Sequence, residues 1–104
     1  MSLPHFVRLL SFANEDLKKN NQFRARAIQM ARTQFHDCAK RLGIRVVSEY
    51  VTGSYDLITI LETTDPNAML RVTKMTGSIK GITNVQTLEA VPAEDFQKSS
   101  VMRQ

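Results

Sequence analysis

The sequence predicts an α+β domain in which two helices cover one face of a four-stranded antiparallel sheet. Two observations predict this class: strand-like and helix-like segments follow one another in the order β-α-β-β-α-β, and a short turn joins the two middle strands. A chain of 104 residues is long enough for one hydrophobic core. We therefore expect a single domain over residues 1–104, with its core at about 5–91 and a C-terminal tail at 92–104.

The first half of the chain supplies one strand and one long helix. Residues 5–12, HFVRLLSF, are rich in β-formers and aliphatic side chains, and a polar loop follows them. Residues 22–42 repeat with a helical period, and Gly43 supplies a natural end. The apolar arc of this helix consists of Phe23, Ala27, Met30, Ala31, Phe35, Cys38, Ala39 and Leu42.

The second half supplies a hairpin, a shorter helix and a last strand. Residues 44–51 and 55–62 are β-branched and aromatic, and the turn at 52–54 makes them an antiparallel pair. Asp65 followed by Pro66 is a helix start, with an N-cap and a proline at the first helical position. The apolar face of this helix consists of Ala68, Met69, Val72, Met75 and Ile79. We expect it to fray at 77–81, followed by a strand at 83–91 and one helical turn near Phe96.

This order of elements, with right-handed crossovers, predicts the ferredoxin-like strand order 4-1-3-2. The first and third strands are then central, and both are apolar on two faces. In residues 5–12, Phe6 and Leu10 alternate with Val7 and Leu9, and in residues 55–62 Leu57 and Leu61 alternate with Ile58 and Ile60. The predicted edge strands carry polar residues, namely Arg45, Glu49, Asn84, Gln86 and Glu89.

The second apolar face of the sheet predicts a partner. Four strands of about six residues present roughly 400 Å² of flat area, near the largest apolar patch that a soluble monomer leaves open. A second copy in two-fold symmetry is the simplest cover, so we expect a homodimer whose two sheets enclose a barrel-like core. The alternative is that the tail folds over this face with Phe96, Val101 and Met102.

Composition narrows the class of protein. No apolar run reaches transmembrane length, and the lone Cys38 fits a reducing compartment, so we expect a cytoplasmic protein without membrane partners. The net charge of +4 is concentrated between Lys18 and Arg45, where eight basic residues face one acid, Asp37. Nucleic-acid binding through this helix is one hypothesis, opposed by the lack of a recognition motif and of aromatic residues for base stacking.

Several motifs resemble the GYD domain family. They are Tyr50-Val51-Thr52-Gly53-Ser54-Tyr55-Asp56, the Asp65-Pro66 helix start, Gly81 six residues before Thr87-Leu88-Glu89-Ala90, and Glu94-Asp95-Phe96. The resemblance covers about residues 41–98. It implies a fold similar to dimeric α/β-barrel proteins and a family with no general biochemical activity assigned to it.

The turn motif contains the first candidate site residues. Gly53 can adopt positive φ in a tight turn, and Asp56 can bond to nearby backbone amides, so a structural role competes with a ligand site. Tyr50 and Tyr55 flank the turn, where their hydroxyls either border a pocket or simply pack at the sheet edge.

Arg8 is the most informative single candidate, because it lies in the middle of a central strand. A buried guanidinium needs an anion. It either pairs with Glu49, Glu62 or Glu89, or it anchors an acidic ligand.

Metal and catalytic motifs give weaker signals. His36 and Cys38 are two residues apart on a helix and point in different directions, so no metal site is expected there. We place Cys38 in the core and His36 in solvent, while His5 stands at a strand start. We expect no cofactor. We expect a module that binds a small molecule or has a regulatory role. The alternative is a cofactor-free monooxygenase or isomerase, with His5, Arg8 or Tyr55 lining its pocket.

Overall fold

A computed structural model of the chain describes residues 4–13, 19–79 and 82–95. It contains β1 (His5–Phe12), α2 (Asn21–Arg41), β2 (Arg45–Tyr50), β3 (Leu57–Glu62), α3 (Pro66–Thr76) and β4 (Thr83–Ala90). The predicted α+β class and the four-stranded antiparallel sheet are confirmed. The helical turn predicted near Phe96 is described at 93–95, whereas Phe96 itself and the apolar tail residues Val101 and Met102 lie outside the described ranges.

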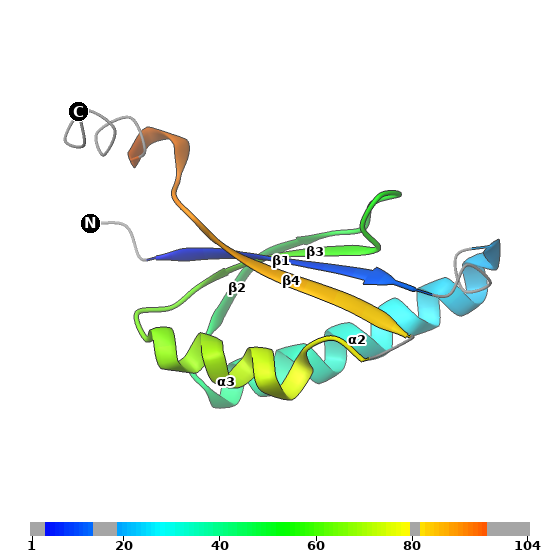
Figure 1. Ribbon diagram of the computed structural model, residues 1–104, viewed down its shortest axis with the longest axis horizontal. Helices are drawn as coiled ribbons and strands as arrows, with labels where there is room; N and C mark the ends of the chain where they lie inside the picture. Colours follow the sequence, from blue (N-terminus) through cyan, green and yellow to red (C-terminus); the bar gives the residue numbers. More distant parts are fainter. Residues whose placement is uncertain (1–3, 14–18, 80–81, 96–104) are drawn as a thin grey trace.

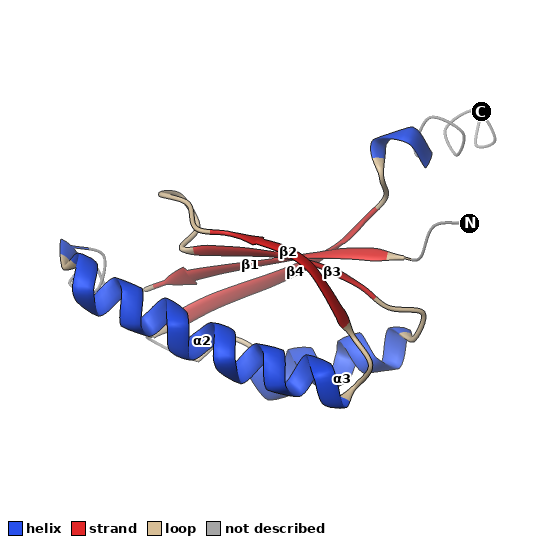
Figure 2. Ribbon diagram, turned by 180° about the vertical axis from the view of Figure 1, so that it is seen from behind, coloured by secondary structure: helices blue, strands red, loops and turns tan. Residues whose placement is uncertain are grey.

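The sheet has the strand order β2-β3-β1-β4, so β1 and β3 are the inner strands. In Figure 1 and Figure 2, α2 and α3 lie on the same side of this sheet. Among the described helices, none is long and apolar enough to cross a membrane.

Helix ends follow local chemistry. The Asn20 side chain caps α2 by accepting from the amides of Gln22 and Phe23, and Asp65 caps α3 by accepting from the amide of Asn67. Gly43 follows the end of α2 with φ of 72° and is the only residue with positive φ in the described part of the chain. Gly53 therefore does not have the positive φ expected of it.

The hairpin loop is longer than the sequence predicted. β2 ends at Tyr50 and β3 begins at Leu57, so six residues connect them and Tyr55 lies outside the strand. Asp56, the last residue of the loop, anchors it to the rest of the domain. Its side chain is buried, with 1% exposure of the residue, and accepts hydrogen bonds from the Phe12 amide at 2.7 Å and from Arg24 Nε at 2.9 Å. The expected bond from Asp56 to nearby amides is replaced by one to an amide of β1.

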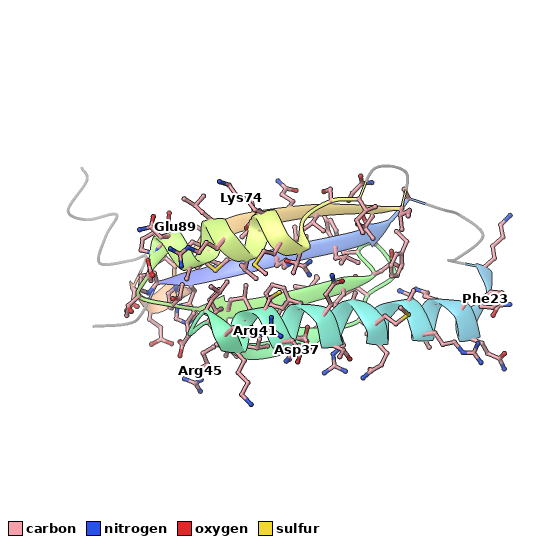
Figure 3. All side chains as sticks on the ribbon, turned by 90° about the horizontal axis from the view of Figure 1, so that it is seen from below. Phe23, Asp37, Arg41, Arg45, Lys74 and Glu89 are labelled. Atoms are coloured by element: carbon pink, nitrogen blue, oxygen red, sulfur yellow. The ribbon has the colours of Figure 1, made fainter. Side chains whose placement is uncertain are left out.

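The core between sheet and helices consists of two separate apolar clusters. One contains Phe35, Ala39, Ile44, Leu61, Ala68, Met69 and Val72. The other contains Leu10, Phe12, Ile28 and Leu57. Several residues on the predicted helix faces are not in either cluster, since Phe23, Met30, Met75 and Ile79 are all more than half exposed. Figure 3 shows Phe23 at the N-terminal end of α2, beyond the sheet.

Candidate functional site

A row of polar residues crosses the helix-facing side of the sheet between the two apolar clusters. Thr59 of β3 is in register with Arg8 of β1 on one side and with Glu49 of β2 on the other. Thr59 and Arg8 are 0% and 4% exposed. The Thr59 hydroxyl donates to Glu49 Oε2 at 2.8 Å. The row therefore places a carboxylate and a guanidinium inside the layer that the helices cover.

A β-bulge in β2 sets the direction of Glu49. The register shifts between Val46 and Ser48, so Val47 is an extra residue in β2. Beyond the bulge Glu49 faces the helices and Tyr50 faces the opposite side of the sheet, next to Ile58. Without this shift the two side chains would exchange faces, because strand residues alternate.

Three donors surround the Glu49 carboxylate. Arg32 Nε lies 2.9 Å from Oε1, His36 Nε2 lies 2.6 Å from the same oxygen, and the Thr59 hydroxyl bonds the other. Burial raises the pKa of Glu49. The hydrogen bonds from His36, Arg32 and Thr59 lower it by more than burial raises it, so the net pKa is below the ordinary 4.5. His36, expected in solvent, has a side chain that is 40% exposed and that also bonds this carboxylate.

The two terminal nitrogens of Arg8 differ in their hydrogen bonding. Its Nη2 donates to the Thr76 carbonyl at 2.7 Å, at the C-terminal end of α3, and its guanidinium carbon lies 4.4 Å from the centroid of the Phe35 ring. Its Nη1 is buried and has no hydrogen-bond partner among the described residues. Burial lowers the pKa of Arg8 to about 10, although the nearby Glu49 carboxylate opposes this shift.

The ion pair expected for Arg8 does not form within the described part of the chain. Glu49 is taken by Arg32 and His36. Glu62 is bonded by Arg45 Nη1 at 2.6 Å, with His5 Nε2 at 3.4 Å. Two of the three carboxylates that the sequence offered to Arg8, those of Glu49 and Glu62, therefore bind other cations, and among the described residues Glu89 forms no ion pair with Arg8.

A groove of about 750 Å³ begins at Arg8 and runs between α2 and the segment that follows α3. Its origin is the unequal length of the helices: 21 residues extend for about 31 Å and 11 residues for about 16 Å, so α3 stops before α2 does. In Figure 1, α3 spans only part of the sheet. The lining, which we call the Arg8 groove, includes Arg8, Leu10, Phe12, Met30, Met75, Ile79 and Ile82.

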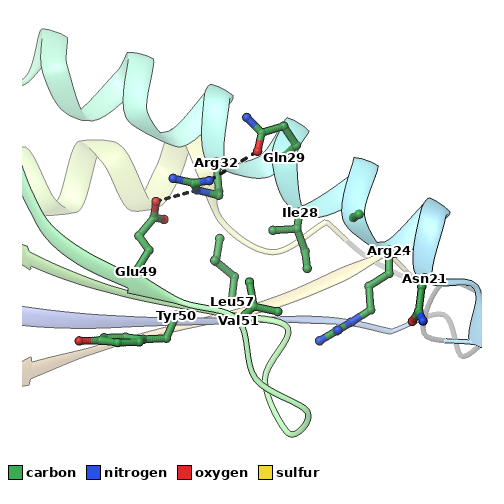
Figure 4. A pocket seen from close by; sticks show the side chains of 10 residues that line it. Asn21, Arg24, Ile28, Gln29, Arg32, Glu49, Tyr50, Val51 and Leu57 are labelled. Atoms are coloured by element: carbon green, nitrogen blue, oxygen red, sulfur yellow. Dashed lines mark hydrogen bonds and ion pairs between the residues drawn. The ribbon is translucent and has the colours of Figure 1, made fainter.

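A second hollow of about 440 Å³ lies on the other side of α2, beside β2 (Figure 4). Its charged groups already bond one another or the backbone: Arg32 pairs with Glu49, and Arg24 pairs with Asp56 and donates to the Thr52 carbonyl. Since these donors are committed, the Arg8 groove is the better candidate for a ligand.

The structure separates the residues that the sequence grouped as a site. Arg8 lines the groove. Tyr50 is 58% exposed, and Figure 4 shows its ring on the side of the sheet away from α2. Tyr55 is 40% exposed in the loop, where its amide donates to Thr52 Oγ1 at 2.9 Å. Asp56 is buried below the loop and fully engaged. A ligand role for the two tyrosines and Asp56 stays a prediction.

The remaining candidates do not converge on the groove. His5 lies on β1 one residue out of phase with the helix-facing Phe6 and Arg8, and it contacts Glu62 instead. Cys38 packs against the larger apolar cluster, as expected. In the ranges that the structure describes, no three side chains of His, Cys, Asp or Glu come together as metal ligands would.

Comparison with known families adds the final observation. The sequence profile of the GYD domain matches residues 6–99, nearly the whole chain. This chain belongs to the GYD domain family. The match extends the resemblance in residues 41–98 to β1 and α2, so the strand that carries Arg8 is part of the GYD domain. A search of curated proteins finds no match.

The groove walls of this GYD domain were missed by sequence reasoning. Met30, Met75 and Ile79 have the spacing of core residues, and the sequence placed them in the core. They are instead 73%, 55% and 53% exposed around the groove. The signal in the sequence that could have indicated this exposure is the width of the apolar arc on the first helix, which is wider than packing against one sheet face and a second helix requires.

Proposed function

We propose that this GYD domain is a cytoplasmic module that binds a small molecule in the Arg8 groove. One observation carries the proposal: Arg8, which is 4% exposed and whose Nη1 has no hydrogen-bond partner among the described residues, lines a mostly apolar groove of about 750 Å³. Ligand sites are concave, mostly apolar and supplied with a few directed polar groups, and this volume is within their usual range.

We further propose that the protomer is ferredoxin-like and pairs as a dimeric α/β barrel. The support is the side of the sheet opposite to α2 and α3 (Figure 2). On it, register aligns apolar residues of all four strands: Val7, Leu9, Tyr50, Ile58, Ile60 and Leu88. Tyr50 and Leu88 are 58% and 44% exposed, and each such side chain gains about 1.5–3 kcal/mol when covered.

The two alternatives have less support. The enzyme hypothesis expected His5, Arg8 or Tyr55 to line a pocket, but His5 faces the opposite side of the sheet from Arg8 and Tyr55 lies in the hairpin loop. Nucleic-acid binding would use the basic residues of α2, of which Arg24 and Arg32 are already paired with Asp56 and Glu49.

The binding proposal is tested by native mass spectrometry of protein purified from cells. We expect a retained small molecule that disappears when Gln34→Trp fills the groove mouth. Gln22→Trp is the matched control, because Gln22 is an exposed glutamine on the same helix that does not line the groove. Equal retention in both variants would place the ligand elsewhere and contradict the proposal.

A further inference from the structure

The Arg8 groove has a single cationic group, Arg8, among its described lining residues, and its walls are mostly apolar. We propose that its ligand is a monocarboxylic acid with an extended apolar body, bound with its carboxylate at Arg8 and its body along the groove. This inference rests on the proposed function and adds the chemical class of the ligand to it.

The charge of the groove favours one negative charge over two. Arg8 is the only Lys or Arg among the described lining residues, and the lining also includes the acid Asp37. Of the two terminal nitrogens of Arg8, Nη2 already donates to the Thr76 carbonyl, and Nη1 has no partner within the part of the chain that the structure describes. The single positive charge of this guanidinium, with the two N–H groups of Nη1 open to a ligand, matches one carboxylate, whereas a phosphate dianion is usually bound by several charged groups.

The walls favour an apolar body. Leu10 and Phe12 of β1 border the groove where α3 no longer covers them. Around them lie the exposed side chains of Met30, Met75 and Ile82. Methionine is flexible and adapts to irregular apolar shapes, so two methionines at the rim suit a chain or ring of variable outline.

The anchor is positioned before any ligand arrives. The Thr76 carbonyl and the Phe35 ring hold the guanidinium from two directions, and Arg8 lies in an inner strand between β3 and β4. A charged donor that is already desolvated and oriented loses little entropy on binding, so it discriminates strongly between an acid and its neutral analogue.

Three probes of equal chain length test this inference: octanoate, octanamide and octyl phosphate. Each is titrated into the ¹⁵N-labelled full chain, and binding is followed by amide chemical shifts and calorimetry. We expect octanoate to shift groove amides and to bind about tenfold or more tightly than octanamide. In Arg8→Met, which keeps an apolar side chain of similar length, the two affinities become equal.

Each other outcome has a defined meaning. Equal binding of octanoate and octanamide in the unmodified protein overturns the acid inference and leaves the binding function standing. Tighter binding of octyl phosphate overturns the restriction to a single charge. Absence of any shift at groove amides overturns the binding function as well. Met75→Gln should weaken octanoate binding, and Leu70→Gln, at a similarly exposed position of α3 outside the groove, should leave it unchanged.

Discussion

The Arg8 guanidinium lies 4.4 Å from the centroid of the Phe35 ring, and both residues are almost completely buried. This contact keeps a positive charge inside the protein without a carboxylate partner in the described chain. Ion burial of this kind is costly, and this cost supports the proposal that Arg8 anchors a ligand.

Arg8→Met should raise the free energy of unfolding. Burial lowers the pKa of Arg8 from its ordinary value to about 10, and a shift of this size corresponds to roughly 3 kcal/mol against the charged form at neutral pH. Removing that penalty outweighs the lost bond to Thr76, so we expect a gain of about 1–3 kcal/mol in urea unfolding.

Arg45→Met is the control for this change, because the Arg45 side chain is 73% exposed in its pair with Glu62. It should alter stability by less than about 1 kcal/mol. A clear loss of stability in Arg8→Met would mean that Arg8 is a structural cap of α3.

A charge on the open side of the sheet should separate the proposed dimer. Leu88→Lys places an ammonium among Val7, Ile58 and Ile60, where a second copy would otherwise pack. In sedimentation velocity we expect a dimer for the unmodified chain and a monomer for this variant. Leu70→Lys, on α3, should remain dimeric. Stable monomers of the unmodified protein at high concentration would contradict the proposed pairing.

Stability should fall when Glu49 becomes protonated. Because hydrogen bonds hold its folded-state pKa below 4.5, Glu49 contributes stability that is complete above about pH 4.5 and is lost as the pH falls through the folded-state value. Urea unfolding from pH 7 to about pH 3 should show the advantage over Glu49→Gln shrinking in this window. Glu89→Gln, at an exposed position of β4, is the matched control for the loss of one carboxylate charge.

Removal of the Asp56 carboxylate should lower the free energy of unfolding. Asp56→Ala leaves the buried Phe12 amide and Arg24 Nε without an acceptor, which costs about 1–3 kcal/mol. Asp65→Ala, which removes only an exposed helix cap, should cost about 1 kcal/mol. The structural role of Asp56 would be wrong if the Asp56→Ala variant had the same free energy of unfolding as the unmodified chain but bound the ligand more weakly.

Sequence patterns predicted the fold because the relevant signals are local. The Asp65-Pro66 start, Gly43 and the two-sided apolar pattern of residues 5–12 and 57–62 each report on their own neighbourhood. The bulge at Val47 was not predictable in this way, since one extra residue depends on pairing with β3. This bulge exchanged the faces of the sheet on which Glu49 and Tyr50 lie, and it therefore changed which cations pair with Glu49.

The site was only partly predictable for the same reason. Arg8 stood out because a charge in a central strand is rare, but its surroundings depend on where α3 ends. Helical spacing cannot distinguish a residue that packs from one that borders an open groove. Met30 and Met75 therefore looked like core residues, although they are the exposed walls of the proposed site.

The most direct test of the central claim is a crystal structure of the chain with octanoate. We predict a carboxylate oxygen within about 3 Å of Arg8 Nη1 and the alkyl chain lying along Met30 and Met75. A carboxylate facing solvent, or octanoate bound only on the opposite side of the sheet, would contradict it.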